Sequence, residues 1–110
     1  MPFDETIADR VRPQLVRRAG FAEKKMFGGV GFLLDGNMCV GVWKHWLIAR
    51  IGTDAYDKAL ERPGVKEFDI TGRPMRGWVM IEPSGIRGDI QLTAWIERAV
   101  DFVRTLPGKV

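Results

Sequence analysis

The sequence predicts an α+β domain in which helices pack on one face of an antiparallel sheet. Helix patterns stand near both ends of the chain, and strand-like apolar runs crowd its middle. The links between those runs are too short for parallel crossovers, so neighbouring strands are expected to be antiparallel. A chain of 110 residues with 45% hydrophobic and 28% charged side chains suits one globular domain, residues 1–110. Grouped strands flanked by helices are typical of the α+β class.

The first helix is expected over residues 3–19. Apolar side chains recur there every four residues, at Phe3, Ile7, Val11 and Leu15. Acidic residues crowd its start and Arg17 and Arg18 crowd its end, which complements the helix dipole. Gly20 is a stop signal. Pro13 is expected to bend or divide this helix, because it removes one backbone hydrogen bond.

Four strand-like segments follow, at residues 21–27, 30–34, 38–43 and 46–51. Asp35-Gly36 is a favoured pair for a two-residue hairpin turn. Lys44-His45 is short enough for a second hairpin, although it lacks the usual Asn-Gly chemistry. Residues 30–34 are apolar throughout, so we expect both of their faces to be covered. These segments together predict an antiparallel meander.

The second half of the chain predicts two helices and one or two strands. Thr53 is expected to cap a short helix that ends near Leu60. Residues 65–70 and 77–82 have strand composition. Asp89 is expected to cap the last helix. Its apolar stripe is Leu92, Trp95, Ile96, Ala99, Val100, Val103 and Leu106. The expected order is helix, three or four strands, helix, one or two strands, helix.

A cluster of glycines marks the corner before the first hairpin. Its structural signature comprises Met26, Phe27, Gly28, Gly29, Gly31, Asp35 and Gly36. Neither common nucleotide-binding glycine pattern is present, and a phosphate cradle would need a helix where a strand follows. We therefore interpret the glycines as a kink or bulge at which strands approach closely.

Few residue types suited to catalysis are present. Ser84 lies between proline and glycine, as a turn residue does, and the chain has a single histidine, His45, and a single cysteine, Cys39. A Cys39–His45 pair is conceivable, but a cysteine in an apolar strand is usually inert. Three acidic side chains of the short helix are expected to form a solvated face: Asp54, Asp57 and Glu61. We expect no catalytic residue, metal site or cofactor, with a small-molecule or enzyme pocket near His45 as the alternative.

The composition favours a cytoplasmic protein without membrane association. The lone Cys39 cannot form an internal disulfide, which suits a reducing compartment. The sequence shows no signal peptide pattern, and no apolar run approaches the roughly 18–20 residues that span a bilayer. The net charge is +3 and the pI is about 9.4, which is mildly basic.

Two surfaces are predicted from exposed aromatic and basic residues. The first is a protein-interaction patch, formed with the sheet-edge strands, whose members are Lys24, Lys25, Phe27, Trp46 and Trp78. The alternative is a weak nucleic-acid surface made of Arg17, Arg18, Lys24 and Lys25.

Several motifs in a fixed order resemble those of the TfoX/Sxy N-terminal domain family over about residues 4–104. They are Lys25-Met26-Phe27-Gly28-Gly29-Val30-Gly31-Phe32, Asp35-Gly36 before Met38, Ala49-Arg50-Ile51-Gly52, Pro74-Met75 before Trp78, and Leu92 with Trp95. The resemblance implies a two-layer, secretion-chaperone-like α+β domain in a bacterial cytoplasm, linked to transcriptional regulation of competence genes. Full-length regulators carry a second, helical C-terminal domain. The resemblance to the first domain already fills nearly all of these 110 residues, so we expect a stand-alone first domain here.

The leading hypothesis is a non-catalytic regulatory or protein-interaction module with an unknown protein partner. A homodimer is one assembly that it permits.

Overall fold

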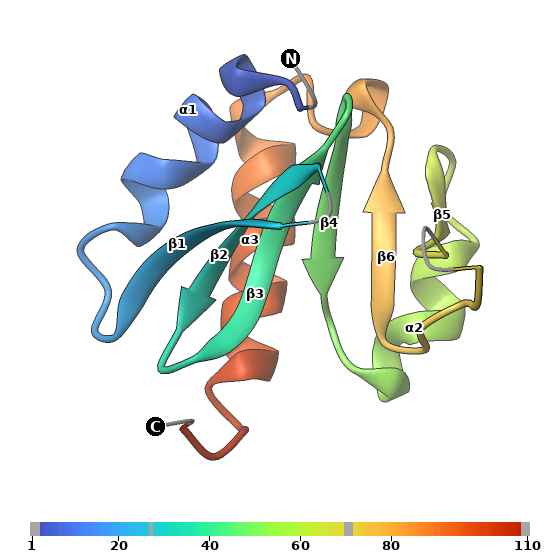
Figure 1. Ribbon diagram of the computed structural model, residues 1–110. Helices are drawn as coiled ribbons and strands as arrows, with labels where there is room; N and C mark the ends of the chain where they lie inside the picture. Colours follow the sequence, from blue (N-terminus) through green and yellow to red (C-terminus); the bar gives the residue numbers. More distant parts are fainter. Residues whose placement is uncertain (1–2, 27, 70–71, 109–110) are drawn as a thin grey trace.

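A computed structural model describes residues 3–26, 28–69 and 72–108. It is an α+β structure with a six-stranded antiparallel sheet in the order β1-β2-β3-β4-β6-β5 (Figure 1). The elements are α1 (Glu5–Leu15), β1 (Phe21–Met26), β2 (Gly29–Leu34), β3 (Asn37–Trp43), β4 (Trp46–Arg50), α2 (Thr53–Leu60), β5 (Val65–Glu67), β6 (Trp78–Ile81), the 3-10 turn η1 (Pro83–Gly85) and α3 (Asp89–Val103). The predicted fold class is confirmed.

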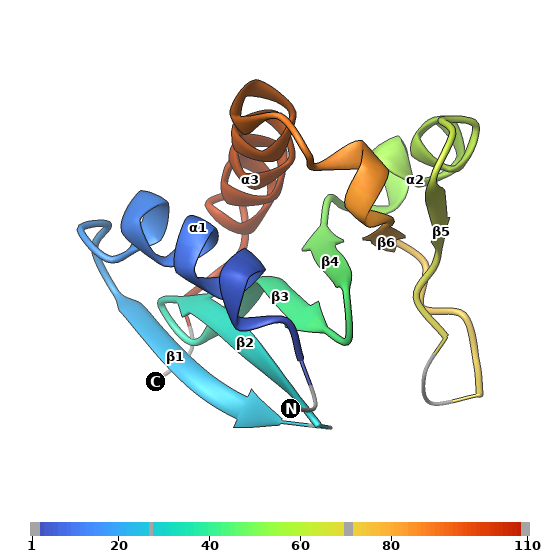
Figure 2. The same cartoon turned by 90° about the horizontal axis from the view of Figure 1, so that it is seen from above.

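The three helices lie on one side of the sheet. Figure 2 shows α1, α2 and α3 above the strands, and Figure 1 looks onto the opposite face. Among the described elements, no helix covers that opposite face, which we call the open face. The fold therefore has two layers, and one surface of the sheet is not covered by any of the described helices.

The first helix is shorter than the sequence predicted, because it ends at Leu15 rather than at residue 19. Asp4 caps its start by accepting a hydrogen bond from the Thr6 backbone N–H at 2.9 Å. Pro13 lies inside the helix without dividing it. The chain must then turn to enter β1, and Gly20, with φ +76°, completes that turn.

The expected caps of the other two helices were wrong by one residue. Gly52, not Thr53, is the N-cap of α2, and Gly88, not Asp89, is that of α3. Gly52 has φ +88°, and a Cβ there would lie 2.5 Å from the Phe102 ring, so a bare backbone is needed. The Gly88 N–H donates a hydrogen bond to the Gln91 side chain at 3.1 Å, which satisfies one free donor of the helix start.

Both predicted hairpins are present. Asp35 and Gly36 have φ +52° and +80°, and they join the paired residues Leu34 and Asn37. Both central residues of the tight turn take the positive φ that matches strand twist. In the second hairpin, Lys44 takes φ +53° although it is not a glycine or asparagine. The last two strands are shorter than their sequence patterns suggested.

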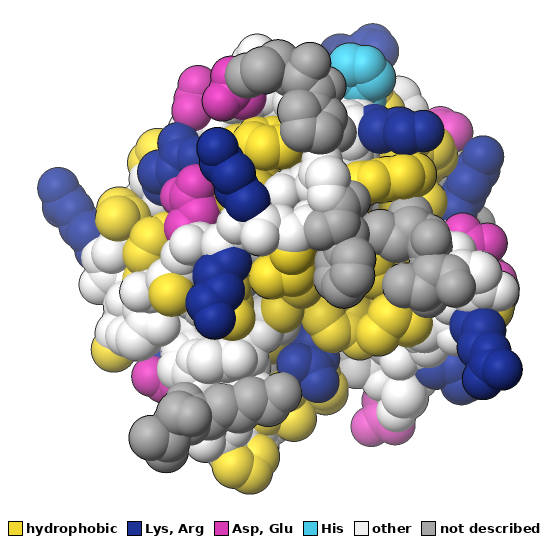
Figure 3. Space-filling model, viewed as in Figure 1, with side chains coloured by type: hydrophobic (Ala, Val, Ile, Leu, Met, Phe, Trp, Pro, Cys, Tyr) yellow, Lys and Arg dark blue, Asp and Glu magenta, His cyan; other side chains and the backbone are white. Residues whose placement is uncertain are grey.

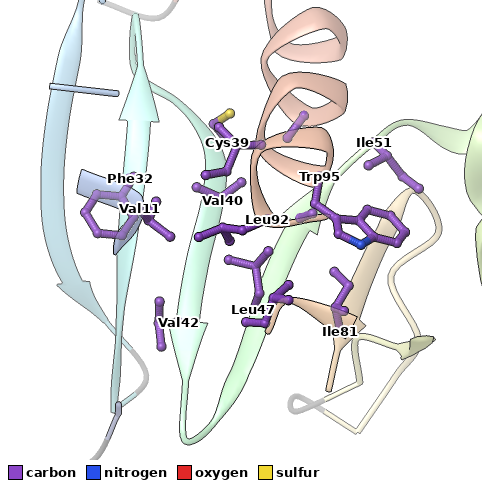
Figure 4. Packing of buried hydrophobic residues seen from close by; sticks show 14 of the residues in the cluster. Val11, Phe32, Cys39, Val40, Val42, Leu47, Ile51, Ile81, Leu92 and Trp95 are labelled. Carbon is purple, nitrogen blue, oxygen red and sulfur yellow. The ribbon is translucent and has the colours of Figure 1, made fainter. Parts of the chain in front are cut away.

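The main core lies between the sheet and the helices (Figure 4). It is built mainly of branched aliphatic side chains from every layer, including Val11, Val40, Leu47, Ile81 and Leu92. All five are completely buried or nearly so. Burying such side chains is the main favourable contribution to folding, at about 1.5–3 kcal/mol for each one.

Candidate interaction surface

The open face is best described by one row of residues that crosses all six strands. Side chains alternate between the two faces of a strand, and the pairing register connects the neighbours. The row, from one sheet edge to the other, is Lys24, Gly31, Gly41, Ile48, Met80 and Lys66. A lysine therefore stands at each end, and glycine or apolar side chains fill the middle.

A second apolar cluster covers the central strands of this face. Ile48, Phe68 and Met80 are its buried members. Half-buried side chains pack around them: Met38, Trp43, Trp46 and Trp78. The rings of Phe68 and Trp78 stack with their centroids 5.8 Å apart. Figure 3 shows hydrophobic side chains gathered in the middle of this face.

The glycines of the open face make room for methionines. A Cβ on Gly41 would lie 2.7 Å from the Met38 methyl carbon, and one on Gly31 would lie 3.1 Å from the Met26 methyl carbon. A Cβ on Gly29 would lie only 2.3 Å from the Val42 carbonyl oxygen. At Gly29 the backbones of β2 and β3 therefore approach too closely for a side chain.

An apolar pocket of about 230 Å³ opens between these side chains. Its walls come from β1 to β4 and from the segment that leads to β6, and they include Met26, Met38, Trp43, Phe68, Met75 and Trp78. Methionine is flexible and polarisable, so a wall rich in methionine adapts to different apolar groups.

Cations surround the aromatic rings of this face. The Lys44 Nζ lies 4.6 Å from the Trp43 ring centroid, and the Lys66 Nζ lies 5.3 Å from the Trp46 ring centroid. The Arg50 guanidinium lies 5.0 Å from the Trp78 ring centroid. The carboxylate of Glu82 lies 4.0 Å from the Lys66 Nζ. The open face is thus apolar at its centre and basic around its rim.

A family model matches most of the chain. The family model of the TfoX N-terminal domain matches residues 14–103 of the 110-residue chain. The chain belongs to the TfoX N-terminal domain family. The searches of curated proteins and of solved structures found no match. In the described part of this TfoX N-terminal domain, no helix is both long enough and apolar enough to cross a bilayer.

The predicted interaction residues of the TfoX N-terminal domain do not all share one surface. Trp46 and Trp78 both belong to the open face, and so does Lys24. Lys25 points to the other side, because it alternates with Lys24 and shares the side of Glu23, which binds Arg12 of α1. Phe27 lies outside the described residues.

The four basic residues predicted for nucleic acid are also separated. Arg18 donates hydrogen bonds to the Gln14 carbonyl oxygen and to the Glu97 carboxylate of α3, so its charge is paired within the helix layer. Lys24 and Lys25 lie on opposite faces of β1. Arg17 is exposed in the turn after α1. The structure therefore does not gather these side chains into one basic surface.

The cysteine and the histidine are not brought together. Cys39 is fully buried in the main core, and burial raises the pKa of its thiol to about 12. His45 is 76% exposed at the β3–β4 turn, beside a surface hollow of about 360 Å³. Its Nδ1 lies 3.2 Å from the Asp4 carboxylate, and this hydrogen bond lowers the pKa of Asp4.

The acidic side chains of α2 show no metal-site geometry. Asp57 lies 3.5 Å from the Arg76 guanidinium, as part of a surface ion pair. Within residues 3–26, 28–69 and 72–108, no group of three histidine, cysteine, aspartate or glutamate side chains is arranged to hold a metal ion.

Among the open-face residues that sequence reasoning missed are Arg50, Lys66 and Phe68. Two of them come from segments that pair with the meander only through β6, which joins the sheet between β4 and β5. The alternation of Trp46, Ile48 and Arg50 along β4 was the signal that could have placed Arg50 beside the tryptophans.

Proposed function

We propose that this TfoX N-terminal domain is a non-catalytic module that binds another protein through the open face of its sheet. The observation that carries the proposal is the row from Lys24 to Lys66, in which glycine and apolar residues lie between two cations. Tryptophan and methionine are enriched at protein interfaces, and half-buried Trp43, Trp46 and Trp78 ring the centre of this face.

The expected partner is an acidic segment that carries an apolar anchor. The pocket of about 230 Å³ accepts one apolar side chain, and Lys24, Lys44, Arg50 and Lys66 around it attract carboxylates. A second copy of the chain is disfavoured as the occupant, because two copies of this face would bring like charges together. Charge complementarity therefore favours a different protein over a homodimer.

The non-catalytic part of the proposal rests on the state of the two most reactive side chains. The Cys39 thiol is buried and stays protonated at neutral pH, and His45 is held on the surface by Asp4. Membership of the family supports a regulatory role, for which we propose transcriptional or competence control. We also propose a cytoplasmic location, where the free thiol of Cys39 would remain reduced.

Selection of displayed peptides on the immobilised domain tests the proposal. The enriched peptides should combine aromatic or aliphatic residues with aspartate or glutamate. The variant Trp46→Gln should weaken binding of such a peptide by more than about tenfold, because interface tryptophans often contribute 2 kcal/mol or more. The matched control is Val16→Gln, which changes an exposed apolar residue of the helix side.

Three results would contradict the proposal. The first is selection of basic or purely polar peptides. The second is equal loss of binding in Trp46→Gln and Val16→Gln. The third is salt-sensitive binding of mixed-sequence DNA or RNA that is lost in Lys24→Glu and Lys25→Glu alike, which would favour a nucleic-acid role.

A further inference from the structure

A separate hollow lies on the helix side of the sheet, between α3, η1 and the end of α2. Its volume is about 480 Å³, which falls within the range of small-molecule sites. Figure 2 shows these three elements above the sheet, away from the open face. The side chains that matter here are those of Arg62, Val65, Ser84, Ile90, Gln91 and Trp95.

Trp95 forms the centre of this hollow and carries two arginines. Its indole projects from α3 near Ile81 (Figure 4). The Arg62 guanidinium lies 5.2 Å from the Trp95 ring centroid, and the Arg98 guanidinium lies 4.7 Å from it. Two cations therefore pack on one indole, Arg62 from the turn after α2 and Arg98 from α3.

These two arginines differ from three arginines of the helix layer that are paired with carboxylates. Arg10, Arg12 and Arg18 each form an ion pair with a carboxylate. Among the described residues, neither Arg62 nor Arg98 has a carboxylate oxygen within 4.0 Å. Burial lowers the pKa of Arg98, and the nearby charge of Arg62 lowers it further.

Part of the lining of the hollow is apolar. Ile90, at the start of α3, is 87% exposed, the highest value among the exposed large hydrophobic residues described. Pro63 and Ala94 extend this apolar surface beside it. The Ser84 hydroxyl and the Gln91 amide add polar groups to the lining. A ligand of this hollow would thus meet the Arg62 cation and apolar lining residues, with Arg98 nearby on the same indole.

We infer that this hollow binds a small amphiphilic anion, an organic carboxylate, sulfonate or phosphate attached to a flat or short apolar group. The anionic group would lie between Arg62 and Arg98 and relieve the repulsion between them. The apolar group would cover the exposed side chain of Ile90, beside the buried Trp95. The inference is independent of the proposed protein-binding function, because the two surfaces lie on opposite sides of the sheet.

The test uses 2-naphthalenesulfonate as the probe and 2-naphthalenemethanol as its uncharged counterpart. Titration followed by the indole N–H signals in NMR spectra should shift Trp95 and give a Kd below about 1 mM for the sulfonate. The uncharged compound should bind at least about tenfold more weakly, which corresponds to the loss of one charge-assisted contact.

The matched variants are Arg62→Gln with Arg98→Gln, and Arg17→Gln as the control. The double variant should weaken sulfonate binding by at least about tenfold, and it should keep the thermal unfolding temperature, since it removes a like-charge pair. The control should bind as the wild type does. Equal binding of the two naphthalene compounds, or sulfonate binding that the folded double variant retains, would overturn the inference. An unshifted Trp95 signal at saturating probe would overturn it as well.

Discussion

The two faces of the sheet are built from different kinds of residue. Toward the helices, the strands present Val40, Leu47 and Ile81, which are completely buried. Toward the open face, the same strands present glycine, methionine and tryptophan, the edge strands β1 and β5 add lysine, and much of this surface is only half-buried. Both faces are apolar at the centre. The difference lies in shape and adaptability, since branched aliphatic residues fill a fixed core and the open face keeps a pocket.

This difference teaches that apolar content alone does not separate a core from a contact surface. A core made for stability has few voids and no charges at its centre. The open face instead carries a pocket and places Lys44, Arg50 and Lys66 over its tryptophans. We therefore expect substitutions on the helix side to change the free energy of unfolding. Substitutions on the open face should mainly change binding.

The substitution Phe32→Ala should give the largest effect. Phe32 is fully buried on the helix side, and its ring stacks on Phe21 with centroids 6.2 Å apart. Removing a buried phenylalanine lowers the free energy of unfolding by about 3–5 kcal/mol. Urea denaturation of the variant measures this change. Trp46 is only half-buried, so Trp46→Gln should lower the free energy of unfolding by about 1 kcal/mol. Equal losses would remove the distinction between the two faces.

The substitution Gly29→Ala tests the close approach of β2 and β3. The new Cβ would meet the Val42 carbonyl oxygen at 2.3 Å, so the strands must move apart, at a cost of about 1–3 kcal/mol. Gly108→Ala is the control, because its Cβ would meet Asp35 Cβ at an ordinary 3.4 Å. Thermal unfolding of both variants measures the difference. An unchanged Gly29→Ala protein would show that the glycine is not needed for packing.

A smaller, pH-dependent effect is expected from Glu23→Gln, at the edge of the helix side. Arg12 donates hydrogen bonds to both carboxylate oxygens of Glu23, at 2.7 and 3.0 Å, and thereby lowers the pKa of Glu23 below 4.5. The folded state therefore favours the ionised form. The resulting stability is present above pH 4.5 and disappears as the pH falls through the lowered pKa.

At pH 7 the free energy of unfolding of the wild type should exceed that of Glu23→Gln by about 0.5 kcal/mol, as is typical of a partly exposed ion pair. The two proteins should become equally stable at a pH well below the lowered pKa of Glu23, where its carboxyl group is protonated. Urea denaturation at both pH values measures this. A difference that persists at the lower pH would assign the effect to packing instead of charge.

The sequence was most informative where one local rule decided the structure. The Asp35-Gly36 pair predicted its hairpin because this tight turn needs a positive φ at two successive positions, where an aspartate followed by a glycine is favoured. The apolar stripe from Leu92 to Leu106 predicted α3. Its members up to Val103 are buried in that helix, whereas Leu106 lies beyond the helix end and is half-buried. The glycine corner predicted close strand contact, which Gly29 makes with Val42.

The open face depended on information that local patterns do not contain. Lys24 and Lys25 look equivalent in sequence, yet the pairing of β1 with β2 sends them to opposite faces. Phe68 joins the tryptophans only because the chain returns through β6 beside β4. The predicted cap of α2 was wrong for a related reason. Gly52 is required there by the ring of Phe102, which is half a chain away in sequence.

The same two lysines provide the most direct test of the account. Binding of a peptide selected on the wild-type domain should be measured for Lys24→Glu and Lys25→Glu, which reverse neighbouring charges on one exposed strand. The account predicts that Lys24→Glu weakens binding by about tenfold, whereas Lys25→Glu stays within about twofold of the wild type. Equal weakening by both variants, or a larger loss in Lys25→Glu, would contradict the assignment of the open face as the binding surface.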